Sequence, residues 1–231
     1  MCIRDRYEDM AAWGAFFSVF GIVYAIVAGF LLVTVLTKYS DLSLVIENEL
    51  NAIETVRDFL TYLNKKNEEA KCNIKRTLFD YTSSLLNNEW LEMSAHNEPM
   101  DSDTSDELYE IMRKSESIVI ESENDGIVFT AIIENISDIT KLRTRRIALA
   151  NERLPPRLKL LMIFMSFVLV IAFMLLAVQS IYAHIAILAF LTIAIHLLYM
   201  VIEDLDHPFY GVWNISRRPL EELVNRFKKE K

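Results

Sequence analysis

The sequence is poor in the residues that build disulfides, turns and metal sites. Its 231 residues include two cysteines, five glycines, five prolines and four histidines. Cys2 lies at the extreme terminus and Cys72 lies in a polar stretch of helical character, so neither a disulfide framework nor a metal site is indicated. So little glycine and proline argues against a loop-rich or all-β fold. We therefore expect an all-α chain.

Motifs of the common enzyme classes are also missing. The chain has no HExxH, no CxxC and no glycine-rich phosphate loop, and no Ser-His-Asp set is recognisable. His96 has no nucleophile near it in the sequence. We therefore expect neither a catalytic site nor a cofactor.

Charged residues are absent from three long stretches of the chain, 11–37, 160–178 and 181–202. At about 1.5 Å rise per residue, each of the last two is roughly 30 Å long as a helix, which is the thickness of a bilayer's hydrocarbon core. A chain of this size cannot cover so much apolar surface without lipid, so helices buried in a soluble core are the weaker interpretation. The sequence predicts an integral membrane protein with three spans, one over 11–37 and two in a tight hairpin at 158–202.

Small side chains follow the first span at intervals of three and four residues, which places them on one face of a helix. They are Gly14, Ser18, Gly21, Ala25 and Gly29. Such a stripe lets another helix approach closely, so ordinary packing within the membrane is favoured over a pore lined by these residues and Tyr24. His196 lies within the last span, where an ionisable residue is either functional or hydrogen-bonded to a neighbouring helix.

The charged residues 38–157 are expected to form a helical domain between the first span and the hairpin. Its helices are predicted over 41–66, 68–96, 107–121 and 127–154, with a turn at 124–126. The last helix is expected to end before Pro155 and Pro156, because the residue preceding a proline is disfavoured in the α region. Residues 203–231 form a polar tail.

The first of these helices carries a narrow apolar seam with coiled-coil spacing. The seam consists of Ile46, Ile53, Val56, Leu60 and Leu63. Glu49 is expected to face water together with the other charged residues of this helix. If the seam contacts a partner protein, the chain is a membrane-anchored scaffold or signalling module, which is the alternative to a transport function.

An acidic loop is expected over residues 96–107. A calcium site is conceivable at Asp101 and Asp103, but the twelve-residue loop with its glycine and terminal glutamate is missing. We therefore favour a solvated loop without a metal.

Basic residues are concentrated next to the expected hairpin. Seven of them lie between residues 141 and 159, against one acidic residue, which is a strong signal of membrane orientation and also fits anionic lipid headgroups. Nucleic acid is not expected as a partner, because no stacking aromatic residues interleave with this patch. With the basic tail and the uncharged hairpin tip at Gln179 and Ser180, the pattern places 38–158 and 203–231 in the cytoplasm, below a bacterial inner membrane.

The chain begins with residues that resemble the translation of a sequencing adapter, 1–6. We expect 1–10 to be artefactual or disordered and the true amino terminus to be missing. Three spans with an outside start would then derive from four spans with both ends inside.

Two aspartates, Asp204 and Asp206, mark the expected exit of the last span from the membrane. They either form a cap or cation site with neighbouring acidic and histidine side chains, or lie in the last turn of the helix. The second interpretation is favoured, because Pro208 would break the helix and Gly211 would reverse the chain.

Five short patterns occur in a fixed order along the chain. They are Gly21 to Phe30, Glu47-Asn48-Glu49-Leu50, Tyr81 followed by Glu89-Trp90, Arg145-Arg146 before Pro155, and Asp204-Leu205-Asp206-His207-Pro208-Phe209 with Gly211. In this order the set resembles the bacterial bestrophin-like membrane protein family of uncharacterised function. The resemblance covers about residues 10–225, and its most specific parts are the last pattern and the Tyr81 pattern.

The resemblance implies a homo-oligomer of four-span subunits in a lipid bilayer, because the related bestrophins are anion channels with helical cytoplasmic domains. Anions would then be the permeant partners. Calcium gating is not implied. The acidic run that holds calcium in bestrophins is missing here, because Gly211 is followed by Val212, Trp213 and Asn214.

Overall fold

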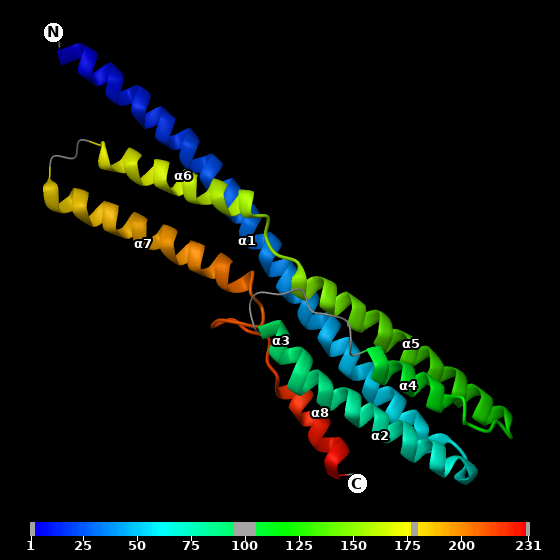
Figure 1. The fold of residues 1–231 in the computed structure, drawn as a ribbon. Coiled ribbons are helices and arrows are strands. Elements are labelled where there is room, and N and C mark those ends of the chain that lie inside the picture. The colour runs from blue at the N-terminus through cyan, green and yellow to red at the C-terminus, as the bar shows by residue number, and fades with distance from the viewer. Residues whose placement is uncertain (1–2, 95–104, 177–179, 230–231) are drawn as a thin grey trace. The chain divides into compact units, whose positions relative to one another are not determined.

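A computed structural model of the chain describes residues 3–94, 105–176 and 180–229 (Figure 1). All regular elements in those ranges are helical, as the composition predicts. In order they are α1 (Ile3–Tyr62), the 3-10 turn η1 (Lys65–Asn67), α2 (Glu68–Ser84), the π-helical turn η2 (Leu85–Glu89), α3 (Trp90–Ser94), α4 (Ser105–Ser115), α5 (Glu123–Asn151), α6 (Pro156–Met174), α7 (Ile181–Leu205) and α8 (Arg218–Lys229).

The chain divides into two compact units. The first consists of Met1–Tyr39 and Arg153–His207, and the second of Ser40–Glu152 and Pro208–Lys231. Helix α1 is continuous across the boundary and contributes residues to both units. The separate helix expected over 41–66 is therefore the second half of one longer helix, because no proline or glycine interrupts the sequence between 30 and 62.

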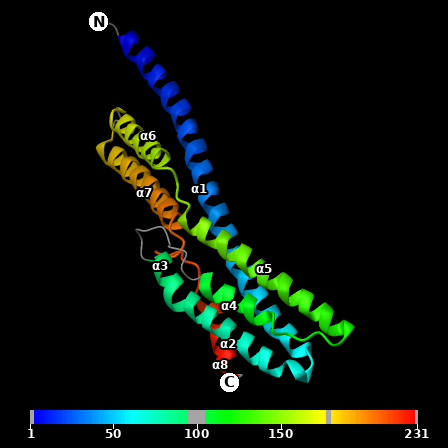
Figure 2. The same ribbon diagram turned by 45° about the vertical axis from the view of Figure 1, so that its right-hand side comes forward.

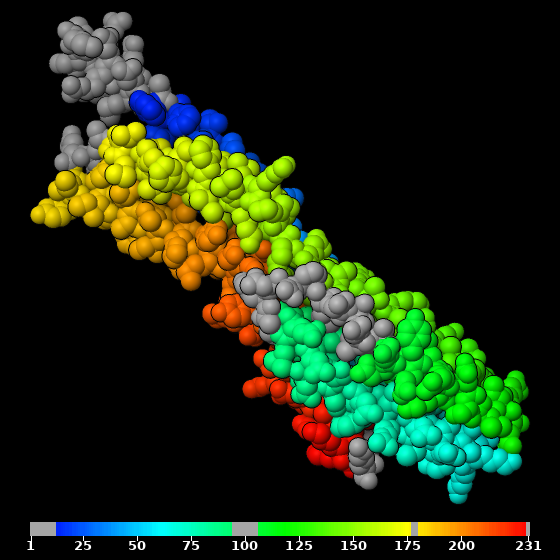
Figure 3. Space-filling view, viewed as in Figure 1, coloured from blue at the N-terminus to red at the C-terminus, as the bar shows by residue number. Residues whose placement is uncertain are grey.

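The first unit is a bundle of α1, α6 and α7. Figures 1 and 3 show α6 and α7 side by side, with their side chains filling the space between them. α1 buries one face, and the buried positions recur every three or four residues, as expected of a helix packed on one side. The core of this unit contains Tyr24, Ala28, Leu31, Val35, Leu154, Met162, Met165, Leu169, Ile202 and Leu205.

The remaining faces of the first unit are apolar and exposed. Ile26, Phe167 and Phe190 are examples from the three helices. Three helical segments are long and apolar enough to cross a membrane, within Trp13–Tyr62, Glu123–Met174 and Ile181–Leu205. An apolar surface of this extent needs lipid or other apolar partners. The prediction of three membrane-spanning helices is confirmed, and the chain is an all-α membrane protein.

The second unit is a helical bundle with its own apolar core. Figures 1 and 2 show α2, α4 and α5 running alongside the second half of α1. All five seam residues, four of them in α1 and Leu63 just beyond its end, are buried. The seam therefore packs against helices of its own chain, and the surface on which the scaffold alternative depended is already covered. The largest buried side chains of the unit include Trp90, Arg146, Tyr81, Ile53, Leu60, Ile74, Leu78, Ile111, Ile132 and Ile136.

Two of the boundaries that differ from the prediction have an identifiable cause. α4 ends at Ser115 and not at 121. The backbone beyond it is hydrogen-bonded at Val119 to the side chain of Asn67. That amide donates to the Val119 carbonyl at 3.0 Å and accepts from its N–H at 2.8 Å, so it takes the place of a helical partner.

The turn expected at 124–126 was also wrong, because these residues form the first turn of α5. The Ser122 hydroxyl accepts a hydrogen bond from the Asp125 N–H, and the Asp125 carboxylate accepts one from the Ser122 N–H. This capping box overrides the turn preference of asparagine, aspartate and glycine. The hydrogen bond from the Ser122 hydroxyl also lowers the pKa of Asp125, against a smaller opposing effect of burial.

Some expectations fall on residues outside the described ranges. They are the possible calcium ligands Asp101 and Asp103, the hairpin tip at Gln179, and the first two residues of the adapter-like start at 1–6. Within the described ranges, no group of three or more histidine, cysteine, aspartate or glutamate side chains is placed to hold a metal ion.

Candidate functional site

The second unit buries an ion pair between α1 and α5. Glu49 is 1% exposed and Arg146 is 0% exposed. The Arg146 Nε donates to Glu49 Oε2 at 2.7 Å, and its Nη2 lies 3.3 Å from Oε1, so the pair is bidentate. The expectation that Glu49 faces water was therefore wrong. Its charge is tolerated in the core because a guanidinium on another helix meets both oxygens.

A second carboxylate, Glu89, completes the cluster. It is 1% exposed and ends the π-helical turn η2. Its Oε2 accepts from Arg146 Nη2 at 2.5 Å, and its Oε1 accepts from Arg143 Nε at 3.0 Å. Two carboxylates thus face two guanidiniums, and the cluster has no net charge. Arg143 and Arg146 had been counted among the basic residues available to lipid headgroups, but both are buried and paired with carboxylates.

The π turn explains how Glu89 reaches this cluster. An α-helix turns by about 100° per residue, so residues eight apart, such as Tyr81 and Glu89, would point about 80° apart around the axis. A π turn absorbs one additional residue, so the two side chains are spaced as though about seven apart and lie on nearly the same face. The turn at Leu85–Glu89 therefore directs both side chains to the α1–α5 contact.

Tyr81 supplies a neutral donor to the cluster. Its hydroxyl donates to Glu49 Oε1 at 2.5 Å, and its side chain is 1% exposed. The cluster consists of Glu49, Tyr81, Glu89, Arg143 and Arg146, and we call it the charge cluster. It links α1, α2, η2 and α5 through side chains as far as 97 residues apart in the sequence.

The two carboxylates stabilise the charged form of the Arg146 guanidinium. Burial lowers the pKa of Arg146, but the charges of Glu49 and Glu89 outweigh burial and raise that pKa above its ordinary value. The guanidinium therefore stays charged. Arg146 therefore acts in this cluster as a fixed positive charge between two carboxylates.

The Tyr81 phenol is expected to make stability fall above about pH 10. Burial and then the charge of Glu49 raise its pKa well above the ordinary value, with Arg146 opposing them. The unfolded phenol ionises near pH 10, so above that pH the folded state binds the additional proton and stability decreases as pH rises. In Tyr81→Phe, thermal unfolding followed from about pH 8 to about pH 11 should show a shallower alkaline loss than the parent protein. Equal slopes would contradict this assignment.

An aromatic contact adjoins the charge cluster. Trp90 follows Glu89 directly, is buried, and meets Phe209 edge to face with ring centroids 5.3 Å apart. The backbone after Phe209 closes on itself, because the Ile215 N–H donates to the Pro208 carbonyl at 2.8 Å. Gly211 has φ 109°, a value that side chains disfavour, so glycine is required within this loop.

Residues of four separate sequence patterns thus meet in the second unit. Glu49, Tyr81, Glu89 and Arg146 form one cluster, and Trp90 with Phe209 forms the neighbouring contact. Arg145 is exposed and takes no part in either.

Pro155 and the two aspartates of the last pattern lie in the first unit. Asp206 follows the last turn of α7, and its Oδ1 accepts from the Leu154 N–H at 2.8 Å, next to Pro155 at the start of α6. Lys159 Nζ lies 2.8 Å from Asp206 Oδ2 and 2.9 Å from Glu203 Oε2. Asp206 thereby ties the end of α7 to the chain entering α6. Asp204 is half-buried beside it.

The candidate pore or packing residues fall on different faces of the first unit. Tyr24 is buried, and its hydroxyl accepts from Ser166 Oγ at 3.2 Å. A Cβ added at Gly21 or Gly29 would meet no atom within 4 Å, so neither glycine serves a close contact inside one chain. Ala25 and His196 are exposed.

Glu49 and Arg143 were missed as members of the charge cluster. The spacing of the apolar residues could have indicated both. Arg143 and Arg146 continue the spacing of the buried apolar residues of α5, and Glu49 falls on the buried apolar face of α1. The buried positions of α5 are Asp125, Val128, Ile132, Ile136, Ile139, Arg143, Arg146 and Ala150.

Solved structures share this fold. A crystal structure of a bacterial bestrophin homologue from Klebsiella pneumoniae is 15% identical to the chain, with a TM-score of 0.74, and the match covers 93% of this chain and 84% of that one. A single-residue variant of a homologue from the same organism gives 15% identity, a TM-score of 0.75, and coverage of 93% and 85%. Among curated proteins, none matches the sequence.

The family is shown by the sequence itself. Residues 4–220 match the Bestrophin-like domain, which accounts for most of the 231 residues. The match includes the charge cluster, the aromatic contact and all three apolar helices. The chain belongs to the Bestrophin-like family.

Proposed function

We propose that the chain is one subunit of an oligomeric channel that conducts anions across a membrane. Its family and its fold support a bestrophin-like channel. The observation that carries the proposal is an exposed apolar face of α1 in the first unit. No helix of the described part of the same chain packs against it.

That face is defined by Ile22, Ile26 and Phe30, which are 61%, 65% and 68% exposed. Spaced four residues apart, they lie along one side of the helix. Tyr24 and Leu31 lie on another side of α1 and are buried against the chain's own helices. Copies of α1 arranged around a common axis, with Ile22, Ile26 and Phe30 inward, would form a narrow apolar passage.

An apolar constriction controls flow by excluding water, so it opens and closes with small changes in width or polarity. The passage carries no ring of charged side chains, because residues 11–37 contain none. The selectivity of the passage among ions would then depend on how readily each ion loses its hydration water.

The proposal is tested by reconstituting the full chain in liposomes loaded with chloride. We expect chloride efflux above that of protein-free liposomes and a symmetric oligomer in detergent. A monomer with no flux would contradict the proposal.

Replacing Ile26 with threonine is expected to raise anion flux several-fold, because a hydroxyl in the constriction favours wetting. The matched control is Leu197→Thr, at an exposed apolar position of α7. Chloride efflux from liposomes with equal protein content measures both. Equal effects of the two substitutions would place the passage elsewhere.

We also propose that the second unit and the carboxyl terminus lie in the cytoplasm and that the membrane is the bacterial inner membrane. The exposed basic residues near the hairpin, Lys141, Arg145 and Arg157, and the basic tail support this orientation. The scaffold alternative is less well supported, because its apolar seam is buried within the second unit.

A further inference from the structure

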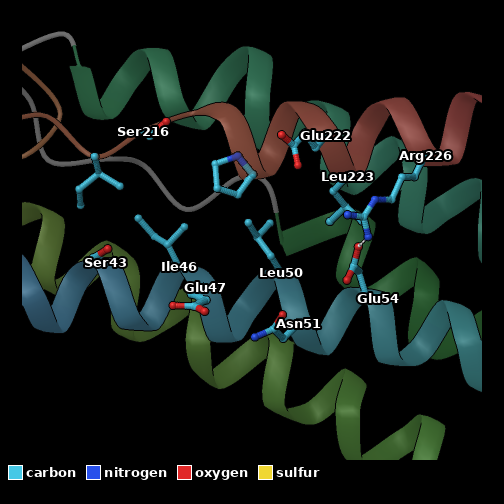
Figure 4. Close-up of a pocket in the computed structure, with 12 residues that line it drawn as sticks. Ser43, Ile46, Glu47, Leu50, Asn51, Glu54, Ser216, Glu222, Leu223 and Arg226 are labelled. Carbon is cyan, nitrogen blue, oxygen red and sulfur yellow. Dashed lines mark hydrogen bonds and ion pairs between the residues drawn. The ribbon is translucent and has the colours of Figure 1, made fainter.

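A groove of about 340 Å³ lies in the second unit between α1 and α8 (Figure 4). Its floor is apolar. Ile46 and Leu50 of α1 face Leu223 of α8 across the groove, and Ile215 and Pro219 extend the lining. Cavities of this size and character hold small organic molecules in proteins.

The rim of the groove has an excess of negative charge. Glu47 and Glu54 line it from α1, and Glu222 and Arg226 line it from α8. Arg226 Nη1 meets Glu54 Oε1 at 2.5 Å, so this pair is neutral and joins the two helices at one end. Glu47 and Glu222 are exposed, and neither makes an ion pair with any residue that the structure describes.

We propose that this groove binds a small organic cation, namely an amine carried on an apolar body. The apolar body would pack against Ile46, Leu50 and Leu223, which line the groove. The ammonium group would meet the Glu47 and Glu222 carboxylates, whose charges no cation of the described chain offsets. An anion is disfavoured, because three carboxylates line the groove against one guanidinium.

Such a ligand would bridge α1 and α8. At present α8 is held to α1 by the Glu54–Arg226 pair and by the Arg57 guanidinium, which lies 5.9 Å from the centre of the Phe227 ring. The bridged part of α1 also carries Glu49, so the ligand would act on the helix that the charge cluster fixes. The inference concerns binding and does not depend on whether the protein conducts ions.

The test uses the full chain in detergent and para-fluorophenylethylammonium as the probe, followed by fluorine NMR line broadening. The neutral comparison is the corresponding alcohol with the same ring. We expect the amine to bind and the alcohol to bind at least fivefold more weakly. In Glu47→Gln/Glu222→Gln, amine binding should weaken about five- to tenfold. Partitioning into micelles is the same for every variant, so it cancels in the comparison.

Two further variants test whether binding depends on the groove itself. Glu92→Gln/Glu134→Gln removes two exposed charges of the second unit outside the groove and should leave binding unchanged. Ser216→Trp fills the groove without changing charge and should abolish binding. Equal binding of amine and alcohol, equal loss in both double variants, or no binding because a second copy occupies the groove would each overturn the proposal.

Discussion

Replacing Arg146 with methionine is expected to destabilise the second unit by about 3–5 kcal/mol. The substitution leaves Glu49 and Glu89 buried with fewer cationic partners, and removing one partner of a buried ion pair leaves the other charge uncompensated. Glu89 keeps Arg143, but among the described residues Glu49 keeps only the Tyr81 hydroxyl. The loss should appear as an earlier first transition when the full chain in detergent is unfolded by guanidinium.

The neighbouring residue provides a matched control. Arg145 is exposed on the same helix, and Arg145→Met removes the same charge at the surface. It should change the unfolding free energy by no more than about 0.5 kcal/mol. Similar losses in both variants would mean that net charge, and not the charge cluster, sets the stability of this unit.

A double-mutant cycle separates the pair from its surroundings. Glu49→Gln combined with Arg146→Met should cost clearly less than the sum of the two single losses, because each single variant leaves an unpaired buried charge. Simple additivity would mean that the bidentate contact between the two side chains contributes little.

The membrane-spanning helices could be predicted from the sequence because lipid imposes a local rule. Each uncharged run must be long enough to cross the hydrocarbon core, and this can be judged without knowing any other part of the chain. The range 181–202 accordingly lies within α7, and the range 160–178 overlaps α6, which begins at Pro156 and ends at Met174. The assignment of the remaining residues to the cytoplasm stays a prediction.

The charge cluster could not be predicted in the same way, because it depends on distant pairing. Glu49 and Arg146 are 97 residues apart, and a carboxylate on an amphipathic helix ordinarily faces water. The direction of Glu89 depends on a π turn, for which its sequence gives no signal that we recognise. The patterns behind the family resemblance nevertheless included Glu49, Tyr81, Glu89 and Arg146, which the structure brings into one contact.

The start of α5 was predicted wrongly because its first residues are common in turns. Asn124, Asp125 and Gly126 favour turns, but Ser122 lies three residues before Asp125 and completes a capping box. The cap satisfies backbone donors of the first turn, so the helix begins at Glu123 in spite of a glycine in that turn. The spacing from serine to aspartate was the better signal.

Replacing Trp90 with alanine is expected to cost about 3–5 kcal/mol of the stability of the second unit. Trp90 is 2% exposed, and its removal would leave a cavity beside Glu89 and Phe209. The loss should be visible in the same guanidinium unfolding of the full chain, followed by circular dichroism because the reporting indole is removed. Tyr109→Ala, at an exposed aromatic position of α4, is the control and should have little effect.

The edge-to-face contact accounts for only part of this loss. Aromatic pairs contribute about 0.5–1.5 kcal/mol beyond their buried area, so Trp90→Ala and Phe209→Leu should show a coupling of that size in a double-mutant cycle. The contact is the point at which the loop Pro208–Ile215 meets the helix that carries Glu89. If Phe209→Leu costs nothing and the coupling is zero, that loop is held by other contacts, and the recurrence of Trp90 and Phe209 in the family patterns needs a different explanation.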